Sequence, residues 1–329
     1  MACFRPLPGW YSKRVNPETG KRSIVFSVSD ALVDRPISVP CGQCTGCRME
    51  RARQWAIRCC HEASLYDDNC FLTLTYNDEN IPQDWSLDKV HLQKFFKRLR
   101  KSIGERRVRY FACGEYGERC RTCGKNRKSC RCACFIKALG RPHYHLILFN
   151  YNFADRVLWK KTKKGDPLFT SEHLSKVWPL GFCSIGGVSF ESAAYVGSYV
   201  TKKKLGPTAW MYYCDYDDVT GEISNVKLPE FSLVSNKPDG LGAGWFKKFV
   251  GDLYPSDECV IRGRTMRVPR YYDQLLKEHS DVLELEVKRK RKSSAYLFRE
   301  NNTSSRHRVR ETVAIAKMDT FRRSYEEDD

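Results

Sequence analysis

Residues 142–149, Pro-His-Tyr-His-Leu-Ile-Leu-Phe, place His143 and His145 two positions apart at the start of an apolar run. The run predicts a β-strand over 144–149, and residues two apart on a strand point to the same face, about 6.6 Å apart. Two imidazoles at that spacing can bind one metal ion. An isolated His-x-His pair more often makes only structural hydrogen bonds, but the chain has 7 histidines in all and two of them open this strand.

The segments around this strand alternate between strand and helix patterns. Alternating β-branched and aromatic residues predict strands over 70–76 and 108–115, and Ser86 is a candidate N-cap for a helix with an apolar stripe from Leu92 to Ile103. This order predicts an α+β fold, a central antiparallel sheet flanked by helices, with Cys-rich insertions. The other predicted elements are a strand over 23–28, a basic amphipathic helix over 47–66, a helix over 171–178, a strand over 182–190 and a helix that Ser192 caps and Gly206-Pro207 ends.

The charge balance indicates an acidic partner. The 329 residues include 57 Lys+Arg and 39 Asp+Glu, a formal net charge of +18, so nucleic acid is the first candidate, with membrane surfaces and acidic proteins as alternatives. Basic residues 160–164 beside Trp159 and 262–270 before Tyr271 either track a single-stranded backbone and stack its bases or form a solvated face. The absence of a long apolar run and of a secretory signal predicts a cytosolic protein with reduced thiols and no membrane partner.

Two clusters of cysteines predict structural Zn²⁺ sites. The first lies in segment 116–140, which has no core-like pattern and is predicted to be an insertion between two strands. It opens with a C-x-x-C pair, whose reduced thiolates suit tetrahedral Zn²⁺, although a solvated hairpin with free thiols is the alternative. The second cluster has tighter spacing but needs a distant fourth ligand. The two sets are Cys120, Cys123, Cys130, Cys132 and Cys134, and Cys41, Cys44 and Cys47 with Cys3 as the distant ligand.

A pair of tyrosines lies on the helix predicted to begin at Ser192. Tyr195 and Tyr199 are four residues apart, which puts both phenols on one face of a helix, about 6 Å apart along its axis. In isolation this pattern more often marks an aromatic stripe packed on a sheet, but Lys202 and Lys203 follow on the Tyr199 side. A neighbouring cation favours the phenolate, the form in which a tyrosine acts as a nucleophile.

Three motifs in this order resemble those of the HUH endonucleases, specifically the replication initiators of small single-stranded DNA phages of the gokushovirus-like Microviridae. Residues 71–76 are similar to the first motif, Pro142-His-Tyr-His145 to the second and Tyr195-x-x-x-Tyr199-x-x-Lys202 to the third. The resemblance covers residues 70–206 and extends weakly to the Cys-rich start. It implies a sheet that carries the histidines, a helix that carries the tyrosines, and rolling-circle nicking and joining of DNA.

The resemblance also implies a catalytic metal ion and a set of partners. His143 and His145 would bind Mg²⁺ or Mn²⁺ together with a third ligand, for which Glu115 is the first candidate and Glu118 the second. Segment 116–140 has to loop out for Glu115 to reach the site. The substrate would be single-stranded and origin DNA in the cytoplasm of the host bacterium. No phosphate-binding loop of the Walker type is present in the sequence, so the host would supply the helicase as well as the polymerase.

The tyrosines would form the covalent intermediate. A phenolate would attack the phosphate, keep the 5′ end as a phosphotyrosine and free a 3′-OH that primes synthesis. We expect Tyr199 to be the more reactive phenol, because Lys202 lies one turn away and lowers the cost of its phenolate. Tyr195 would then serve the later transfer that rejoins the ends.

Two other interpretations remain open at the level of sequence. In the first, the chain is a non-catalytic, zinc-dependent nucleic-acid-binding protein whose histidine and tyrosine pairs are structural. The second, a histidine-triad-like hydrolase, is disfavoured because Ile147 stands where a third histidine would be needed. The predicted organisation is a Cys-rich start and helix over 1–66, a nuclease domain over 67–206 with the insertion 116–140, an extension over 207–287, and a disordered basic tail over 288–329.

Overall fold

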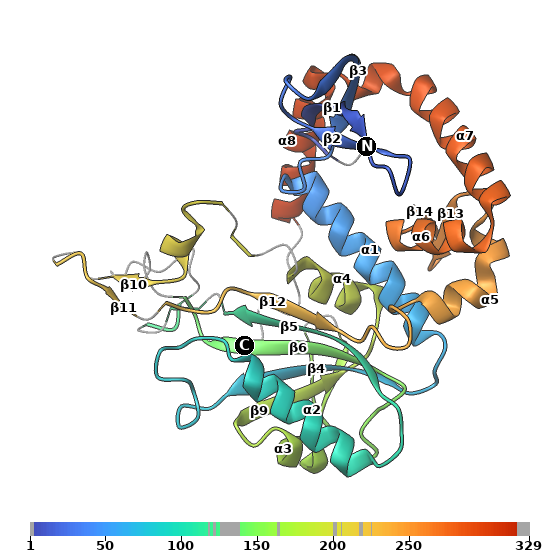
Figure 1. The fold of residues 1–329 in the computed structure, drawn as a ribbon. Helices are drawn as coiled ribbons and strands as arrows, with labels where there is room; N and C mark the ends of the chain where they lie inside the picture. Colours follow the sequence, from blue (N-terminus) through green and yellow to red (C-terminus); the bar gives the residue numbers. More distant parts are fainter. Residues whose placement is uncertain are drawn as a thin grey trace. The chain divides into compact units, whose positions relative to one another are not determined.

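The computed structural model describes residues 3–117, 119–120, 123–125, 139–162, 165–199, 203–204, 206–216, 220–224 and 226–320 (Figure 1). The chain divides into two compact units: a smaller one with the residues up to Arg51 and those from Lys288, and a larger one over Ala52–Val287. The divisions fall inside helix α1 (Thr45–Ala63) and helix α7 (Asp281–Leu297). Every helix in the described part of the chain is too short or too polar to span a bilayer.

A seven-stranded sheet forms the centre of the larger unit. Its strands are β4 (Asn69–Tyr76), β5 (Arg109–Tyr116), β6 (Pro142–Phe149), β7 (Val157–Lys161), β8 (Pro167–Thr170), β9 (Gly181–Gly186) and β12 (Phe231–Val234). The order is β12-β5-β6-β4-β9-β8-β7, and each strand pairs with its neighbours in antiparallel. The predicted α+β fold with a central antiparallel sheet is therefore confirmed. β6 lies between β4 and β5, and all of its residues are buried.

Helices cover both faces of this sheet (Figure 1). They are α2 (Lys89–Ile103), α3 (Glu172–Val177) and α4 (Phe190–Tyr199). Alternation along β6 sends Leu146 and Leu148 into a core with α2 and α3. Ile147 and Phe149 point the other way and pack with α4 and the second half of α1. The two histidines of β6 have the same parity as Ile147, so they lie on the α4 face.

Two helices begin at residues other than those predicted. The N-cap of α2 is Asp88 and not Ser86, because the Asp88 carboxylate accepts a hydrogen bond at 2.6 Å from the backbone N–H two residues on. Helix α4 begins at Phe190, ahead of Ser192. The hydroxyls of Ser189 and Ser192 each accept a hydrogen bond from the other's backbone N–H, at 3.1 and 2.8 Å, so the capping pair is centred earlier than the sequence indicated.

After α4 the larger unit contains elements that are only weakly indicated by the sequence. Helices α5 and α6 share a core with α1 in which Ile57, Phe246 and Tyr272 are buried. This core extends the larger unit beyond the sheet. The elements are η2 (Ala209–Tyr212), β10 (Asp215–Tyr216), β11 (Ile223–Ser224), α5 (Ala243–Leu253), β13 (Glu258–Ile261), β14 (Arg264–Arg267) and α6 (Arg270–His279).

The smaller unit contains a three-stranded antiparallel sheet and C-terminal helices. The strand order is β2-β1-β3, and β2 occupies the first part of the predicted strand over 23–28. The segment from Lys288, predicted to be a disordered tail, is helical in the described residues, since Leu, Glu, Lys, Arg and Ala all favour helices despite its charge. The elements are β1 (Leu7–Val15), β2 (Arg22–Val25), β3 (Ala31–Val39), η3 (Arg299–Asn302) and α8 (Ser304–Thr320).

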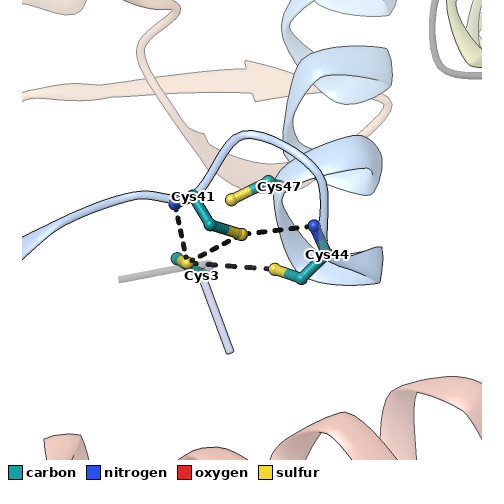
Figure 2. Close-up of side chains that lie close together, drawn as sticks. All are labelled: Cys3, Cys41, Cys44 and Cys47. Atoms are coloured by element: carbon teal, nitrogen blue, oxygen red, sulfur yellow. Dashed lines mark hydrogen bonds between the residues drawn. The ribbon is translucent and has the colours of Figure 1, made fainter. Parts of the chain in front are cut away.

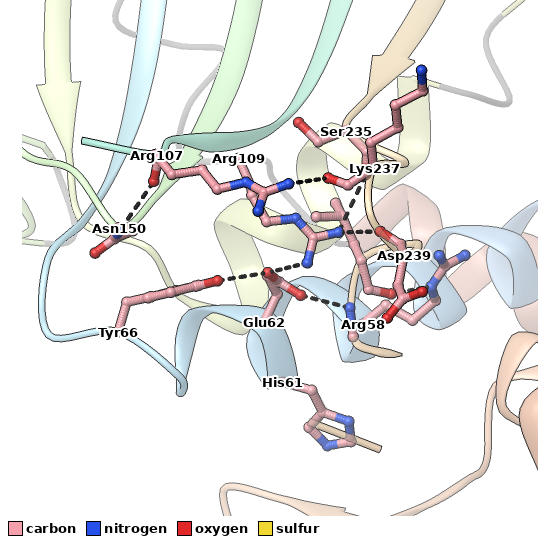
Figure 3. A network of polar contacts seen from close by, with 12 residues as sticks. Arg58, His61, Glu62, Tyr66, Arg107, Arg109, Asn150, Ser235, Lys237 and Asp239 are labelled. Atoms are coloured by element: carbon pink, nitrogen blue, oxygen red, sulfur yellow. Dashed lines mark hydrogen bonds and ion pairs between the residues drawn. The ribbon is translucent and has the colours of Figure 1, made fainter. Parts of the chain in front are cut away.

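A buried carboxylate fixes the second half of α1 to the large sheet (Figure 3). Glu62 is fully buried and accepts hydrogen bonds from the Arg109 guanidinium at 2.8 Å and from the backbone N–H of Gly242 at 2.7 Å. Arg109 also donates to the carbonyl oxygen of Asp239. Removing one partner of a buried ion pair is strongly destabilising. These contacts therefore hold α1 on the same face of the sheet that carries the histidines.

Candidate active site

The register of β5 and β6 brings Glu115 beside the two histidines. Glu115 lies directly opposite His143, and the pairing continues in register through His145. All three side chains therefore share the α4 face of the sheet. The strands stay paired up to both ends of segment 116–140, so the predicted insertion leaves this register intact.

One carboxylate oxygen lies within hydrogen-bonding distance of both imidazoles. Glu115 Oε1 is 2.7 Å from His143 Nε2 and 3.0 Å from His145 Nε2. The exposed fractions of Glu115, His143 and His145 are only 2%, 7% and 3%. Ligands about 2.1 Å from an octahedral Mg²⁺ or Mn²⁺ lie about 3 Å apart along an edge. The three atoms therefore fit one face of an octahedron, which leaves positions for water and phosphate.

The second nitrogen of each imidazole has its own contact. His143 Nδ1 donates to the carbonyl oxygen of Arg141 at 3.2 Å, and His145 Nδ1 lies 3.1 Å from Thr73 Oγ1. Because a carbonyl only accepts, a neutral His143 ring has its lone pair on Nε2, which faces the Glu115 carboxylate. Two acceptors at that distance repel each other unless a proton or a metal cation lies between them. Such contacts are also the usual way in which metal-binding histidines are oriented.

Tyr195 of α4 packs directly on this cluster. Its ring meets the His145 ring edge-on, with the centroids 5.1 Å apart, and makes a tilted contact with Phe71 of β4 at 6.4 Å. Only 8% of Tyr195 is exposed. The residue thus belongs to an aromatic stripe in the core and, at the same time, lies beside the candidate metal ligands.

Gly197 allows α4 to lie close to α1. A Cβ atom at this position would be 2.9 Å from the carbonyl oxygen of Ala52 and 3.2 Å from Cβ of Trp55. Both neighbours belong to α1, which the Glu62 contacts hold on the sheet. The glycine therefore sets how closely α4, with Tyr195, approaches the sheet.

Replacing Gly197 with Ala is expected to lower the free energy of unfolding by about 1–3 kcal/mol, because the new methyl group overpacks the contact between α4 and α1. Gly187→Ala is the matched control, since a Cβ at Gly187 would meet no atom within 4 Å. Denaturant unfolding of both variants measures the difference. Equal stability of the two variants would show that this contact does not hold α4.

Some predicted site residues lie outside the described residues, and others are separated from the cluster. Cys120 is buried and its carbonyl oxygen accepts the backbone N–H of Gly124 at 3.0 Å, a tight turn that suits a C-x-x-C pair, whereas Cys123 is exposed. Lys203 is exposed as well. Outside the described residues lie Glu118, Cys130, Cys132, Cys134, Lys202 and the side chain of Tyr199, the last residue of α4.

The structure brings the other cysteine set together (Figure 2). The thiols of Cys3, Cys41, Cys44 and Cys47 all lie within 4.8 Å of one another. Burial raises the pKa of the Cys44 thiol, but the backbone N–H groups of Phe4 and Cys47 and the neighbouring thiols outweigh burial and lower it to about 6. The cysteines in the described part of the chain form no disulfide.

An open groove of about 350 Å³ adjoins the histidines on the α4 face. It is lined in part by Thr73 of β4, which touches His145, and by Phe182 of β9, whose side chain is 73% exposed. Trp159 of β7, 57% exposed, closes the groove on the far side, and the Lys160 ammonium lies 4.4 Å from its ring centroid. The sequence singled out Trp159 with its lysines but missed Phe182, because alternation along a strand does not reveal where a neighbouring strand stops pairing.

Known proteins of similar sequence are phage replication proteins. A family model described as replication-associated protein ORF2 matches residues 69–123 and 121–204. The chain is 30% identical over 306 residues to replication-associated protein VP4 of Bdellovibrio phage phiMH2K, covering 89% of this chain and 83% of the relative. It is 32% identical over 328 residues to replication-associated protein ORF2 of Spiroplasma virus 4, covering 93% and 91%. No solved structure matches the chain significantly.

Proposed function

Because this chain belongs to the replication-associated protein ORF2 family of phages, we propose that it initiates rolling-circle replication by nicking one DNA strand at an origin. The observation that carries the proposal is the buried cluster of Glu115, His143 and His145 with Tyr195 packed against it. A carboxylate, two imidazoles and a phenol on one face are groups that serve metal-assisted phosphodiester transfer. The net charge of +18 suits a nucleic-acid substrate.

In the proposed reaction a tyrosine of α4 attacks the scissile phosphate. Its Oη atom forms a bond to phosphorus while the bond from phosphorus to the 3′ oxygen breaks, and the freed oxygen takes up a proton. The 5′ end stays on the protein as a phosphotyrosine, and the 3′-OH primes synthesis. Because the phosphodiester energy is conserved in this link, attack by a 3′-OH on the phosphotyrosine rejoins the ends without ATP.

The ligands of the catalytic ion are proposed to be Glu115, His143 and His145. Mg²⁺ or Mn²⁺ bound there would grip a phosphate oxygen and polarise phosphorus. The contacts of the two Nδ1 atoms with the Arg141 carbonyl and the Thr73 hydroxyl keep both Nε2 atoms turned toward Glu115. Burial of all three side chains limits their rotation and so preserves this orientation before DNA binds.

Single-stranded DNA is proposed to enter along the groove beside Thr73. Phe182 and Trp159 expose flat aromatic surfaces there, and Lys160 adds a positive charge next to one of them. Aromatic rings bind unpaired bases by stacking, which contributes about 1–3 kcal/mol per base. A strand held this way passes the histidine cluster, because Thr73 contacts both the groove and His145.

Replacing both Trp159 and Phe182 with Ala is expected to weaken binding of a single-stranded origin oligonucleotide by at least about 10-fold, since each stacked base is worth about 1–3 kcal/mol. Fluorescence anisotropy with labelled oligonucleotide measures the affinity. Trp210→Ala is the matched control, because Trp210 is similarly exposed at 52% but belongs to η2. Loss of affinity no greater than in the control would rule out the groove as the DNA path.

The function is tested by incubating the protein with a single-stranded origin oligonucleotide and Mn²⁺. We expect a protein–DNA band that survives denaturant, together with a shorter product that carries a 3′-OH. A non-catalytic, zinc-dependent binding protein would retard the oligonucleotide in a native gel but leave no such band. In the cell, the cytoplasm of the host bacterium, the host helicase and polymerase would open and copy the duplex.

A further inference from the structure

We infer that Cys3, Cys41, Cys44 and Cys47 form a structural Zn²⁺ site in the smaller unit (Figure 2). Cys3 Sγ lies 3.7 Å from Cys41 Sγ and 3.8 Å from Cys44 Sγ. Four thiolates about 2.3 Å from a tetrahedral Zn²⁺ lie about 3.8 Å from one another. The sulfur atoms therefore already have the spacing of a tetrahedral Zn²⁺ site. This inference does not rest on the proposed function.

The same distances exclude a disulfide between these residues. Bonded sulfur atoms are about 2.05 Å apart, much closer than the 3.7 and 3.8 Å found here. Four thiols pointing into one small volume are also a costly arrangement for apolar packing alone, because no carbon side chain fills the centre. A cation at that centre gives the arrangement a physical cause.

Backbone N–H groups are directed at three of the sulfur contacts. The N–H of Phe4 donates to Cys44 Sγ, that of Cys41 donates to Cys3 Sγ, and that of Cys44 donates to Cys41 Sγ, each at 3.3 Å. Hydrogen bonds of this kind stabilise a thiolate more than a neutral thiol. The local backbone thus favours the charged form in which cysteine binds zinc.

The site explains how the ends of the small sheet are held. Leu7 of β1 pairs with Val39 of β3 at the open end of their hairpin. Cys3 precedes that pair, Cys41 follows it, and Cys47 lies in the first turn of α1. An ion bound to all four thiols would fasten the open end of the hairpin to the start of the helix. With four protein ligands it has no open position, so its role is structural.

The zinc content of the purified full chain under reducing conditions tests this site. Cys44→Ser should contain one zinc ion per chain less than wild type, whereas Cys44→His should retain it because imidazole also binds zinc. Cys70→Ser is the matched control, since Cys70 is buried in β4 and outside both clusters. The comparison with wild type separates this ion from any ion bound by the insertion cysteines.

A second measurement holds even if Cys44→Ser does not fold. A chain with Cys120 and Cys123 replaced by Ser should still bind Co²⁺ in exchange for zinc, with sulfur-to-cobalt charge-transfer absorption and the visible bands of tetrahedral Co²⁺. Absence of both zinc and these bands in that folded chain would overturn the inference, as would equal zinc content in Cys44→Ser and wild type. Either result would leave the proposed nicking reaction untouched.

Discussion

Replacing His145 with Ala should lower the rate of single-strand cleavage by more than about 100-fold. Loss of a residue that merely orients a metal ligand already costs about 10–100-fold, and His145 is proposed to be a ligand itself. Its Nε2 lies 3.0 Å from Glu115 Oε1 in a site that is closed to solvent, so another side chain cannot readily move in to replace it. The same loss is expected for His143→Ala. Cleavage is measured on a labelled origin oligonucleotide with Mn²⁺.

Binding of the oligonucleotide should be nearly unchanged in these variants, because the groove and the net positive charge remain. His173→Ala is the control: His173 lies near α2, where its Nε2 contacts the Ser102 hydroxyl at 2.8 Å. It should cleave like wild type. Undiminished cleavage by both His143→Ala and His145→Ala would end the assignment of the catalytic metal site. Loss of cleavage together with loss of thermal stability would instead point to a purely structural role.

Replacing both Tyr195 and Tyr199 with Phe should abolish the covalent adduct with DNA altogether. These residues are the two phenols of α4, and Phe preserves the ring that packs on His145 and Phe71. Each single variant should still form an adduct with a short oligonucleotide. Complete rounds of cutting and rejoining should need both tyrosines, since a second phenol allows a new cut before the first link is released.

The rates of the single variants report on the division of labour between the tyrosines. The lysine argument predicts that Tyr195→Phe forms its adduct faster than Tyr199→Phe. The contact of Tyr195 with His145 shows that this phenol also lies at the cluster. A slower Tyr195→Phe would therefore mean that closeness to the histidines outweighs the nearby lysines. A denaturing gel over a time course distinguishes the two orders.

The sheet and its histidine face were predictable because they depend on local rules. The period of two along residues 142–149 fixes which side chains share a face, and β6 follows it. The pairing of Glu115 with His143 was harder, since 116–140 separates them along the chain and only the family resemblance suggested it. Strand register over such a separation depends on long-range pairing, which periodicity does not encode.

Features that depend on contacts between distant segments could not be derived from the sequence. The groove at Phe182 exists because β8 and β9 are paired only at Phe169 and Ile185, which leaves the start of β9 exposed. The helix of the C-terminal segment was missed because its charge outweighed its good helix formers in the sequence argument. The close approach of α4 and α1 depends on Gly197, whose importance is visible only once Ala52 lies opposite.

The central claim is that a tyrosine of α4 becomes covalently bound to the 5′ end of cut DNA. Peptide mass spectrometry of the denaturant-stable adduct tests it most directly. We expect the nucleotide mass on the peptide that contains Tyr195 and Tyr199, and its disappearance in the double Phe variant. An adduct on any other residue, or capture of DNA by the double variant, would remove this helix from the mechanism.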